Sequence, residues 1–253
     1  MNKVSVVVPV YNEAPAIAEL LRRVCEAELP PAFEMEVIVI DDGSTDNSMR
    51  SVREFIEANP RWAGVVKLHE SHINHGKGAA VRAGFKVASG NILIVQDADL
   101  EYSPSDYGKL LEPFADPNVH VAYGSRFMHG LPAGMKLPNL VANLVLSWTT
   151  TLLFGQRLTD EATGYKVFRK HVLERFELHS RGFEFCPEFT ANVLKAGFRI
   201  HEVPISYNPR GVNEGKKIRT RDGFIALWWL VKVWLRETFA SRRPTRSSET
   251  RRT

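Results

Sequence analysis

Apolar residues in the first hundred positions fall into short continuous runs, and each run ends at a cluster of polar residues. The runs cover residues 4–10, 36–40, 65–68 and 91–95. They are rich in Val, Ile and Leu and lack the strict alternation of a half-exposed strand, which is typical of parallel strands covered on both faces. Between them, apolar residues recur at helical spacing, as at Ile17, Leu20, Leu21 and Val24. Strands that alternate with helices predict an α/β fold with a mostly parallel sheet.

The polar clusters follow the predicted strands at the same end. Residues 11–13 follow the first run, residues 41–46 the second, and residues 97–99 the fourth. Asp46 is the expected N-cap of the next helix. Because ligands of such sheets bind beyond the carboxyl ends of the strands, we expect these clusters to form one site.

The sequence Asp97-Ala98-Asp99, directly after a buried strand, is the most informative of these clusters. Residues two apart in an extended chain project to the same side, so Asp97, Asp99 and Glu101 beyond them are expected to converge. Carboxylates held that close repel unless a cation lies between them, and oxygen ligands suit Mg²⁺ or Mn²⁺. An acidic turn that merely caps the strand is the alternative. The prediction is a metal site at Asp97, Asp99 and Glu101 that also binds substrate phosphates.

Length and composition limit the class of protein. With 253 residues, 44% of them hydrophobic, the chain can bury one substantial core, so a single domain is expected. The formal net charge of +4 is small and partly owed to the C-terminal residues, so it does not indicate a nucleic-acid partner. Cys25 and Cys186 stand far apart and imply no disulfide framework. The chain opens straight into a strand without a signal peptide, which predicts a cytoplasmic location.

Eight segments, in this order, resemble the family 2 glycosyltransferases with a GT-A fold, particularly the polyprenyl-phosphate sugar synthases such as dolichyl-phosphate mannose synthase. The segments are PVYNE (9–13), DDGSTD (41–46), NHGKG (74–78), DADLE (97–101), GSR (124–126), DEATGYKVF (160–168), EVPISY (202–207) and RGVNEGKK (210–217). The resemblance implies a GT-A (Rossmann-like) catalytic domain over residues 1–221. It also implies metal-dependent, inverting transfer of a hexose from a nucleotide sugar, either GDP-mannose or a UDP-hexose.

The resemblance further implies which residues bind the nucleotide sugar. They are Pro9, Tyr11, Asn12, Glu13, Asp41, Asp42, Lys77, Asp97, Ala98, Asp99, Arg210 and Lys217. Structural roles are the alternatives for several of them. Glu13 also suits the first turn of a helix, and Lys77 suits an exposed loop as well as a phosphate-binding one. Either Asp41 or Asp42 is expected to contact the nucleoside, and Asp42 is the better candidate for bracing the turn.

A polar, Gly-flanked stretch at residues 208–221 is too charged to be core. It is predicted to be either a solvated loop or a mobile lid over phosphate. The resemblance assigns Arg210 and Lys217 to phosphate groups, which Arg binds with two donors and Lys as a point charge. A lid that closes over the nucleotide sugar would exclude water.

The residues predicted to act in catalysis are Asp97, Asp99, Arg126 and Asp160. A polyprenyl phosphate acceptor is already anionic and needs no base, whereas a saccharide hydroxyl needs one, for which Asp160 and Glu161 are candidates. The Gln-x-x-Arg-Trp motif of hydroxyl-directed relatives does not occur, which favours the phosphate. However, the Arg that mannose synthases carry on the segment matched by residues 139–154 is also missing. A transferase acting on a saccharide hydroxyl and a non-catalytic sugar-nucleotide-binding module remain the alternatives.

Two apolar stretches bear on membranes. Residues 140–154 are mostly apolar, and we expect them to be too short to span a bilayer. Residues 222–240 are predicted to form an amphipathic helix whose tryptophans and basic residues suit the headgroup region. Residues 241–253 are predicted to be a disordered basic tail attracted to anionic lipid. These features predict a peripheral enzyme on the cytoplasmic face of the membrane, docked on anionic lipid or on a separate membrane subunit.

Overall fold

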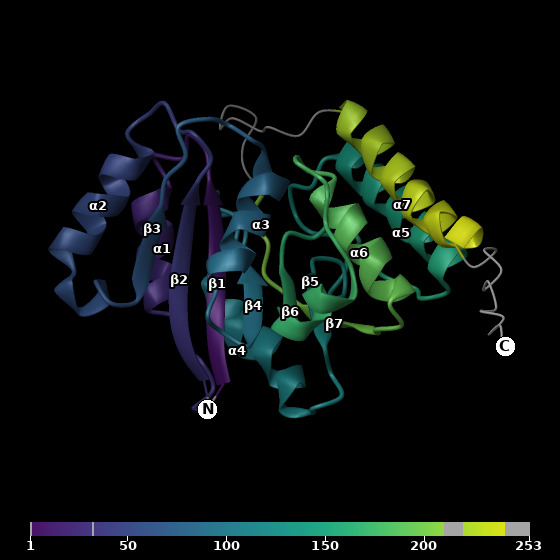
Figure 1. The fold of residues 1–253 in the computed structure, drawn as a ribbon, viewed down its shortest axis with the longest axis horizontal. Coiled ribbons are helices and arrows are strands. Elements are labelled where there is room, and N and C mark those ends of the chain that lie inside the picture. Colours follow the sequence, from purple (N-terminus) through teal and green to yellow (C-terminus); the bar gives the residue numbers. More distant parts are fainter. Residues whose placement is uncertain (1, 32, 210–219, 241–253) are drawn as a thin grey trace, which may run out of the picture.

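A computed structural model describes residues 2–31, 33–209 and 220–240. Its centre is a seven-stranded sheet with the order β3-β2-β1-β4-β6-β5-β7 (Figure 1). The strands are β1 (Asn2–Val10), β2 (Phe33–Asp41), β3 (Val66–His69), β4 (Ile92–Val95), β5 (Val121–Ser125), β6 (Lys166–Arg169) and β7 (Ile200–Pro204). All neighbours are parallel except β6, which is antiparallel to β4 and β5. The mostly parallel α/β sheet predicted from the sequence is confirmed.

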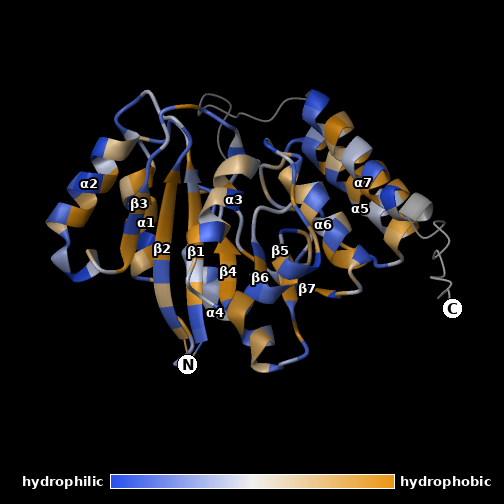
Figure 2. Ribbon diagram, viewed as in Figure 1, coloured by the Kyte–Doolittle hydropathy of each residue, from blue (hydrophilic) through white to orange (hydrophobic). Residues whose placement is uncertain are grey.

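Helices cover both faces of this sheet. They are α1 (Ile17–Cys25), α2 (Ser48–Ala58), α3 (Lys77–Val87), α4 (Tyr107–Leu111), α5 (Leu137–Phe154), α6 (Phe185–Lys195) and α7 (Thr220–Ala240). Short 3-10 helices occupy Pro60–Trp62, Pro104–Asp106, Glu112–Ala115 and Lys170–Arg175. Along β1, Val6 and Val8 pack with α1, α2 and α4, whereas Val7 packs with α3 and α6 on the other face. Burial on both faces explains why β1 has valines on both of its sides, and orange dominates the central strands of Figure 2.

The helices α5 and α7 form an additional layer beside the sheet. The helix α7 packs against both α5 and α6, and the three lie together at one end of the molecule (Figure 1). Their shared core consists of Leu146, Ala191, Ala226, Leu230 and Val233. The helix predicted over residues 222–240 lies within α7 and packs on the domain through this buried stripe. The boundary at residue 221 between a catalytic domain and a separate helix stays a prediction from the sequence. In the structure, α7 packs on α5 and α6.

Candidate active site

The carboxyl ends of β1 and β4 open into a cleft of about 640 Å³. Its walls come from the loops after these strands, from the start of α3, and from α5, α6 and α7. Most of the predicted site residues within the described part of the chain line it, namely Pro9, Tyr11, Glu13, Asp42, Lys77, Asp97, Ala98, Asp99, Glu101 and Arg126. The structure therefore brings together residues from five separate segments of the sequence, as parallel strands ending at one edge require.

Asp97 lies at the centre of the cleft, in contact with Lys77. Its Oδ1 is 2.5 Å from Lys77 Nζ, and both side chains are only 17% exposed. Its Oδ2 lies over Gly164, where an added Cβ would sit 2.5 Å from that oxygen. Asp97 is thus held between an ammonium on one side and a glycine on the other.

The loop that carries Lys77 is fixed by its backbone. Asp42 accepts hydrogen bonds from the amides of His75 (2.7 Å) and Gly76 (2.9 Å). Gly76 has a φ of 94° and packs so closely on the Arg181 carbonyl that a Cβ would lie 2.3 Å from its oxygen. Burial alone would lower the pKa of Lys77, but the nearby Asp97 carboxylate raises it above its usual value, so the ammonium stays charged.

The adjacent Asp41 and Asp42 both brace backbone, but at different places. Asp41 accepts a hydrogen bond from the Ser44 amide (3.0 Å) and so braces its own turn, whereas Asp42 reaches across to brace the Lys77 loop and also lines the cleft. Consecutive side chains at a strand end point to opposite sides, which is why the two carboxylates have different partners. Contact of either residue with the nucleoside stays a prediction.

Asn12 holds two loops together instead of lining the cleft. It has a left-handed backbone with φ 52°, its Oδ1 accepts from the Thr45 amide (2.8 Å), and its amide donates to Ser44 Oγ (3.1 Å). Asp46 accepts from the Ser48 amide (2.9 Å) at the start of α2, and it also accepts from the Ala14 amide (3.1 Å). The expectation that Asp46 is the N-cap was wrong by one residue: the N-cap is Asn47, and Asp46 binds the first amide of α2 from the position before it.

The three predicted metal ligands do not form one cluster. Among the described residues, no group of three or more His, Cys, Asp or Glu side chains is arranged to hold a metal ion. Asp99 Oδ1 accepts from the Glu101 amide (3.1 Å), and Leu100 between them has a φ of 59°, so the chain turns and is not extended. Glu101 Oε2 accepts from the Tyr207 hydroxyl (3.1 Å). Glu101 as a third ligand converging with the pair is therefore a prediction that the turn contradicts.

Asp97 and Asp99 nevertheless fit a divalent cation. Both carboxylates line the cleft, and Mg²⁺ is commonly bound by one or two carboxylates with substrate phosphates and water completing the shell. The donor set of this chain is of that kind: two oxygen ligands on one short loop beside space for a diphosphate.

Arg126 and Asp160 form a two-point ion pair at the cleft wall. Arg126 Nε and Nη2 each lie 2.7 Å from one Asp160 oxygen, and the Arg126 amide also donates to Oδ2 at 3.0 Å. Asp160 is completely buried, whereas Arg126 borders the cleft and lies over the Tyr207 ring at 5.2 Å. Both Asp160 oxygens are thus engaged with Arg126 and face away from solvent.

Glu161, the second candidate base, is also completely buried at the wall of the cleft. Both of its carboxylate oxygens are buried, and burial raises the pKa of the group. Lys166 lies behind it, donates to the Glu161 carbonyl at 3.2 Å, and sits 3.8 Å from the centre of the Tyr123 ring.

One helix that the sequence analysis did not place at the site links the cleft with the molecular surface. The inner side of α5 lines the cleft through Asn143 and Leu146. Its outer side exposes Trp148 (77% exposed) and Leu152 (76% exposed), and α7, which packs against α5, exposes Trp228 (60% exposed). Within the described residues, α5 is the one helix whose length and composition would allow it to cross a membrane, a weak criterion that a helix covering a soluble domain also meets. The expectation that this stretch is too short was therefore wrong, because the helix starts at Leu137.

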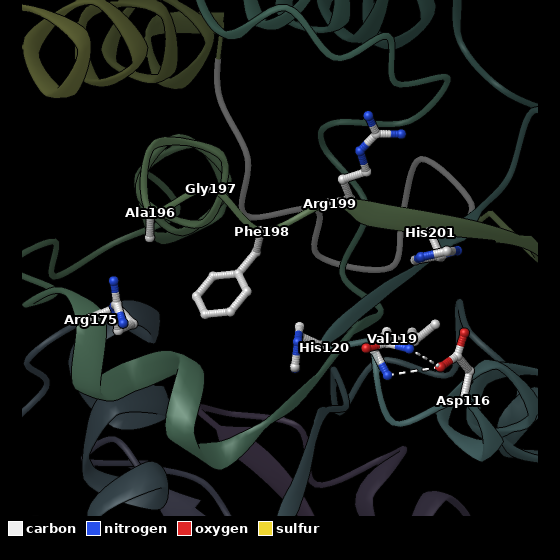
Figure 3. A pocket seen from close by; sticks show the side chains of 10 residues that line it. Asp116, Val119, His120, Arg175, Ala196, Gly197, Phe198, Arg199 and His201 are labelled. Carbon is white, nitrogen blue, oxygen red and sulfur yellow. Dashed lines mark hydrogen bonds between the residues drawn. The ribbon is translucent and has the colours of Figure 1, made fainter.

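A second hollow, of about 550 Å³, lies before the starts of β5 and β7 (Figure 3). It is lined by His120, Arg175, Phe198 and His201, among others. Because it lies at the amino ends of these strands, it is separate from the candidate site.

Several predicted residues cannot be compared with the structure. Arg210 and Lys217, with most of the predicted lid, lie outside the described residues, as does the predicted basic tail at 241–253.

The sequence was compared with family models and characterised proteins. The model described as "Glycosyl transferase family 2" matches residues 5–176. Undecaprenyl-phosphate 4-deoxy-4-formamido-L-arabinose transferase of Klebsiella pneumoniae (strain 342) is 31% identical over 217 residues, which are 85% of this chain and 63% of that protein. Dolichol-phosphate mannosyltransferase of Pyrococcus furiosus is 30% identical over 220 residues, covering 85% and 59%. The chain thus spans about 60% of the length of these relatives.

Solved structures share the fold. Glucosyl-3-phosphoglycerate synthase from Mycobacterium tuberculosis, in complex with Mn²⁺, UDP and phosphoglyceric acid, has a TM-score of 0.69 at 17% identity, covering 93% of this chain and 78% of the other. The same enzyme in complex with Mg²⁺ and UDP has a TM-score of 0.68 at 17% identity, covering 93% and 79%. At this identity the likeness concerns the fold, and it confirms the GT-A architecture expected from the sequence.

Proposed function

The chain belongs to glycosyltransferase family 2, and we propose that it transfers a hexose from a nucleotide sugar to a polyprenyl phosphate. The placement of α5 is the observation that supports this acceptor class. The helix lines the cleft on one side and exposes Trp148 and Leu152 on the other. Such a helix can contact lipid with its outer face while its inner face stands beside Asp97 and Arg126. The names of the relatives, an undecaprenyl-phosphate and a dolichol-phosphate transferase, support the same acceptor class.

Asp97 and Asp99 are proposed to hold Mg²⁺ or Mn²⁺ together with the diphosphate of the donor. Such an ion, when bound, neutralises the charge that grows on the departing nucleoside diphosphate. The structural neighbour binds either Mn²⁺ or Mg²⁺ with UDP, which supports a divalent ion here. Lys77, at the start of α3, adds a positive charge beside Asp97.

Arg126 is proposed to bind a phosphate, and Asp160 to position Arg126. With Nε and Nη2 directed at Asp160, the guanidinium is held in one orientation, and Arg126 lines the cleft. This assignment replaces the idea that Asp160 accepts a proton, because both of its oxygens are buried against Arg126. The burial of the Glu161 oxygens likewise disfavours it as a base for a hydroxyl acceptor.

The absence of an accessible base among these two candidates agrees with a phosphate acceptor. A phosphate oxygen is already anionic and can attack the anomeric carbon opposite the departing diphosphate, which inverts the configuration. The residues of the chain then bind and orient the two substrates and exclude water from the donor.

The test is to offer nucleotide sugars with two acceptor classes in parallel. GDP-mannose, UDP-glucose and UDP-N-acetylglucosamine are first screened by thermal shift with Mn²⁺, because a donor that binds the native state raises its melting temperature. The stabilising donor is then incubated with undecaprenyl phosphate, dolichyl phosphate or a panel of saccharides. We expect a lipid-linked sugar and no saccharide product. Product from saccharides alone would assign the enzyme to the hydroxyl-directed branch of the family.

A peripheral location on the cytoplasmic face of a membrane is proposed as part of this function. The double variant Trp148→Glu/Leu152→Glu should lose vesicle binding by about tenfold or more, since burial of each large apolar side chain contributes about 1.5–3 kcal/mol. Sedimentation with anionic and neutral vesicles at low and high salt measures this. Salt should weaken binding to anionic vesicles through screening.

Val87→Glu is the matched control for this measurement, because Val87 is also an exposed apolar residue of a helix but lies on α3. It should bind vesicles like the unchanged protein. If the unchanged protein stays in the supernatant under all conditions, the α5 surface does not bind lipid directly, and docking on a separate membrane subunit becomes the better account.

A further inference from the structure

We propose that Lys77 and the divalent cation are alternative partners of the same Asp97 oxygen, so that Lys77 must leave Asp97 when metal and nucleotide bind. The inference rests on the proposed metal-dependent function and adds a coupling between the binding of metal and the binding of nucleotide. Lys77 is then both a competitor of the metal and a ligand of the diphosphate.

The distances make simultaneous binding unfavourable. Lys77 Nζ lies 2.5 Å from Asp97 Oδ1. A Mg²⁺ or Mn²⁺ ion on that oxygen would be about 2.1 Å from it, which places the two cations within about 5 Å of each other. Two positive charges at that separation in a largely buried site repel strongly, because little water is present to screen them.

Asp97 cannot avoid the competition by turning away. Its Oδ2 already lies against Gly164, and the Tyr102 ring borders the same glycine. Lys77, by contrast, has a flexible four-carbon stem, and its ammonium is 5.8 Å from the centre of the Phe183 ring at the cleft wall. The movement is therefore expected in the Lys77 side chain.

The backbone beneath Lys77 does not need to move. Asp42 holds the amides of His75 and Gly76, and Gly76 is packed on the Arg181 carbonyl. A side chain that swings on this fixed base exchanges the carboxylate for a phosphate oxygen of the donor. Metal alone leaves Lys77 without an anionic partner, whereas metal with a diphosphate supplies one. Metal and nucleotide should therefore bind cooperatively, each raising the affinity for the other by the same factor.

The experiment measures Mn²⁺ affinity by electron paramagnetic resonance, with and without UDP or GDP. Lys77→Met should bind Mn²⁺ alone about tenfold more tightly than the unchanged protein, because the competing cation is gone. Its gain in affinity on adding the nucleoside diphosphate should be correspondingly smaller. Lys77→Arg keeps a competing charge and should retain weak binding of Mn²⁺ alone.

Lys67→Met is the matched control, because Lys67 also pairs with a carboxylate, Glu36 Oε2 at 2.7 Å, but on β2 and β3. It should leave Mn²⁺ affinity unchanged. Equal or weaker binding of Mn²⁺ to Lys77→Met would overturn the inference, while binding of Mn²⁺ with nucleotide to the unchanged protein would leave the proposed function intact. If the unchanged protein binds no Mn²⁺ even with nucleotide, both the proposed metal dependence and this inference are contradicted.

Discussion

The variant Asp99→Asn is expected to lose activity by about a thousandfold or more, since removing one contact that stabilises developing charge already costs about 10²–10³ in rate. The substitution removes the negative charge that should hold the cation but preserves size. The amide oxygen of Asn can still accept the hydrogen bond from the Glu101 backbone, so the turn should remain. Formation of the lipid-linked sugar measures activity, and the melting temperature reports the fold.

Asp116→Asn is the matched control for this variant. Asp116 Oδ1 accepts from the Asn118 amide at 2.8 Å, the same local bond, but it lies at the opposite end of the sheet (Figure 3). It should keep full activity. Full activity of Asp99→Asn, or of the unchanged protein in EDTA, would contradict the metal-dependent mechanism.

The variant Gly164→Ala is expected to lower turnover by about a hundredfold, because a displaced catalytic group loses much of the benefit of orientation. The new Cβ would lie 2.5 Å from Asp97 Oδ2 and 3.0 Å from a Tyr102 ring carbon, so Asp97 or the segment before β6 must shift. Overpacking of this kind costs about 1–3 kcal/mol of stability, which the protein should survive folded. Steady-state rates measure turnover, and the melting temperature shows whether the variant is folded. A folded variant with low turnover indicates that Asp97 is misaligned.

Gly64→Ala provides the comparison. Nothing lies within 4 Å of a Cβ at this position, so activity and stability should stay near those of the unchanged protein. If Gly164→Ala is as active as Gly64→Ala, the contact between Gly164 and Asp97 has no part in aligning the carboxylate.

The strands that could be predicted from the sequence are those buried on both faces of the sheet, because such burial requires apolar residues at most positions of the strand. The runs that became β1, β2 and β4 are mostly apolar on both sides of the strand because residues such as Val6 and Val7 are buried on opposite faces. Strand β6 was missed because it ends with Arg169 and begins with Lys166, a polar residue that is completely buried. Its burial depends on Tyr123 and Thr190, which are distant in sequence. No local pattern reveals such a partner.

For the site, residue type and strand position predicted membership of the cleft but not the role of each side chain. Asp97 and Asp99 could be found because they follow a buried strand. The turn at Leu100 directs Glu101 away from them, toward Tyr207. This turn depends on a left-handed backbone at a non-glycine residue, a conformation that the sequence does not predict. The pairing of Asp160 with Arg126 likewise joins two loops, and only tertiary packing brings them together.

The antiparallel insertion of β6 has a consequence for how the chain is made. Strand β4 carries β1 on one edge and β6 on the other, and Ile92, Leu93 and Ile94 pair with residues of β6. A ribosome releases β4 long before β6, and at about 5–20 residues per second the interval lasts on the order of several seconds. During that time β4 is an apolar edge strand, the kind that recruits other chains. The nascent protein should therefore be most prone to aggregate, and most in need of a chaperone, between the synthesis of these two strands.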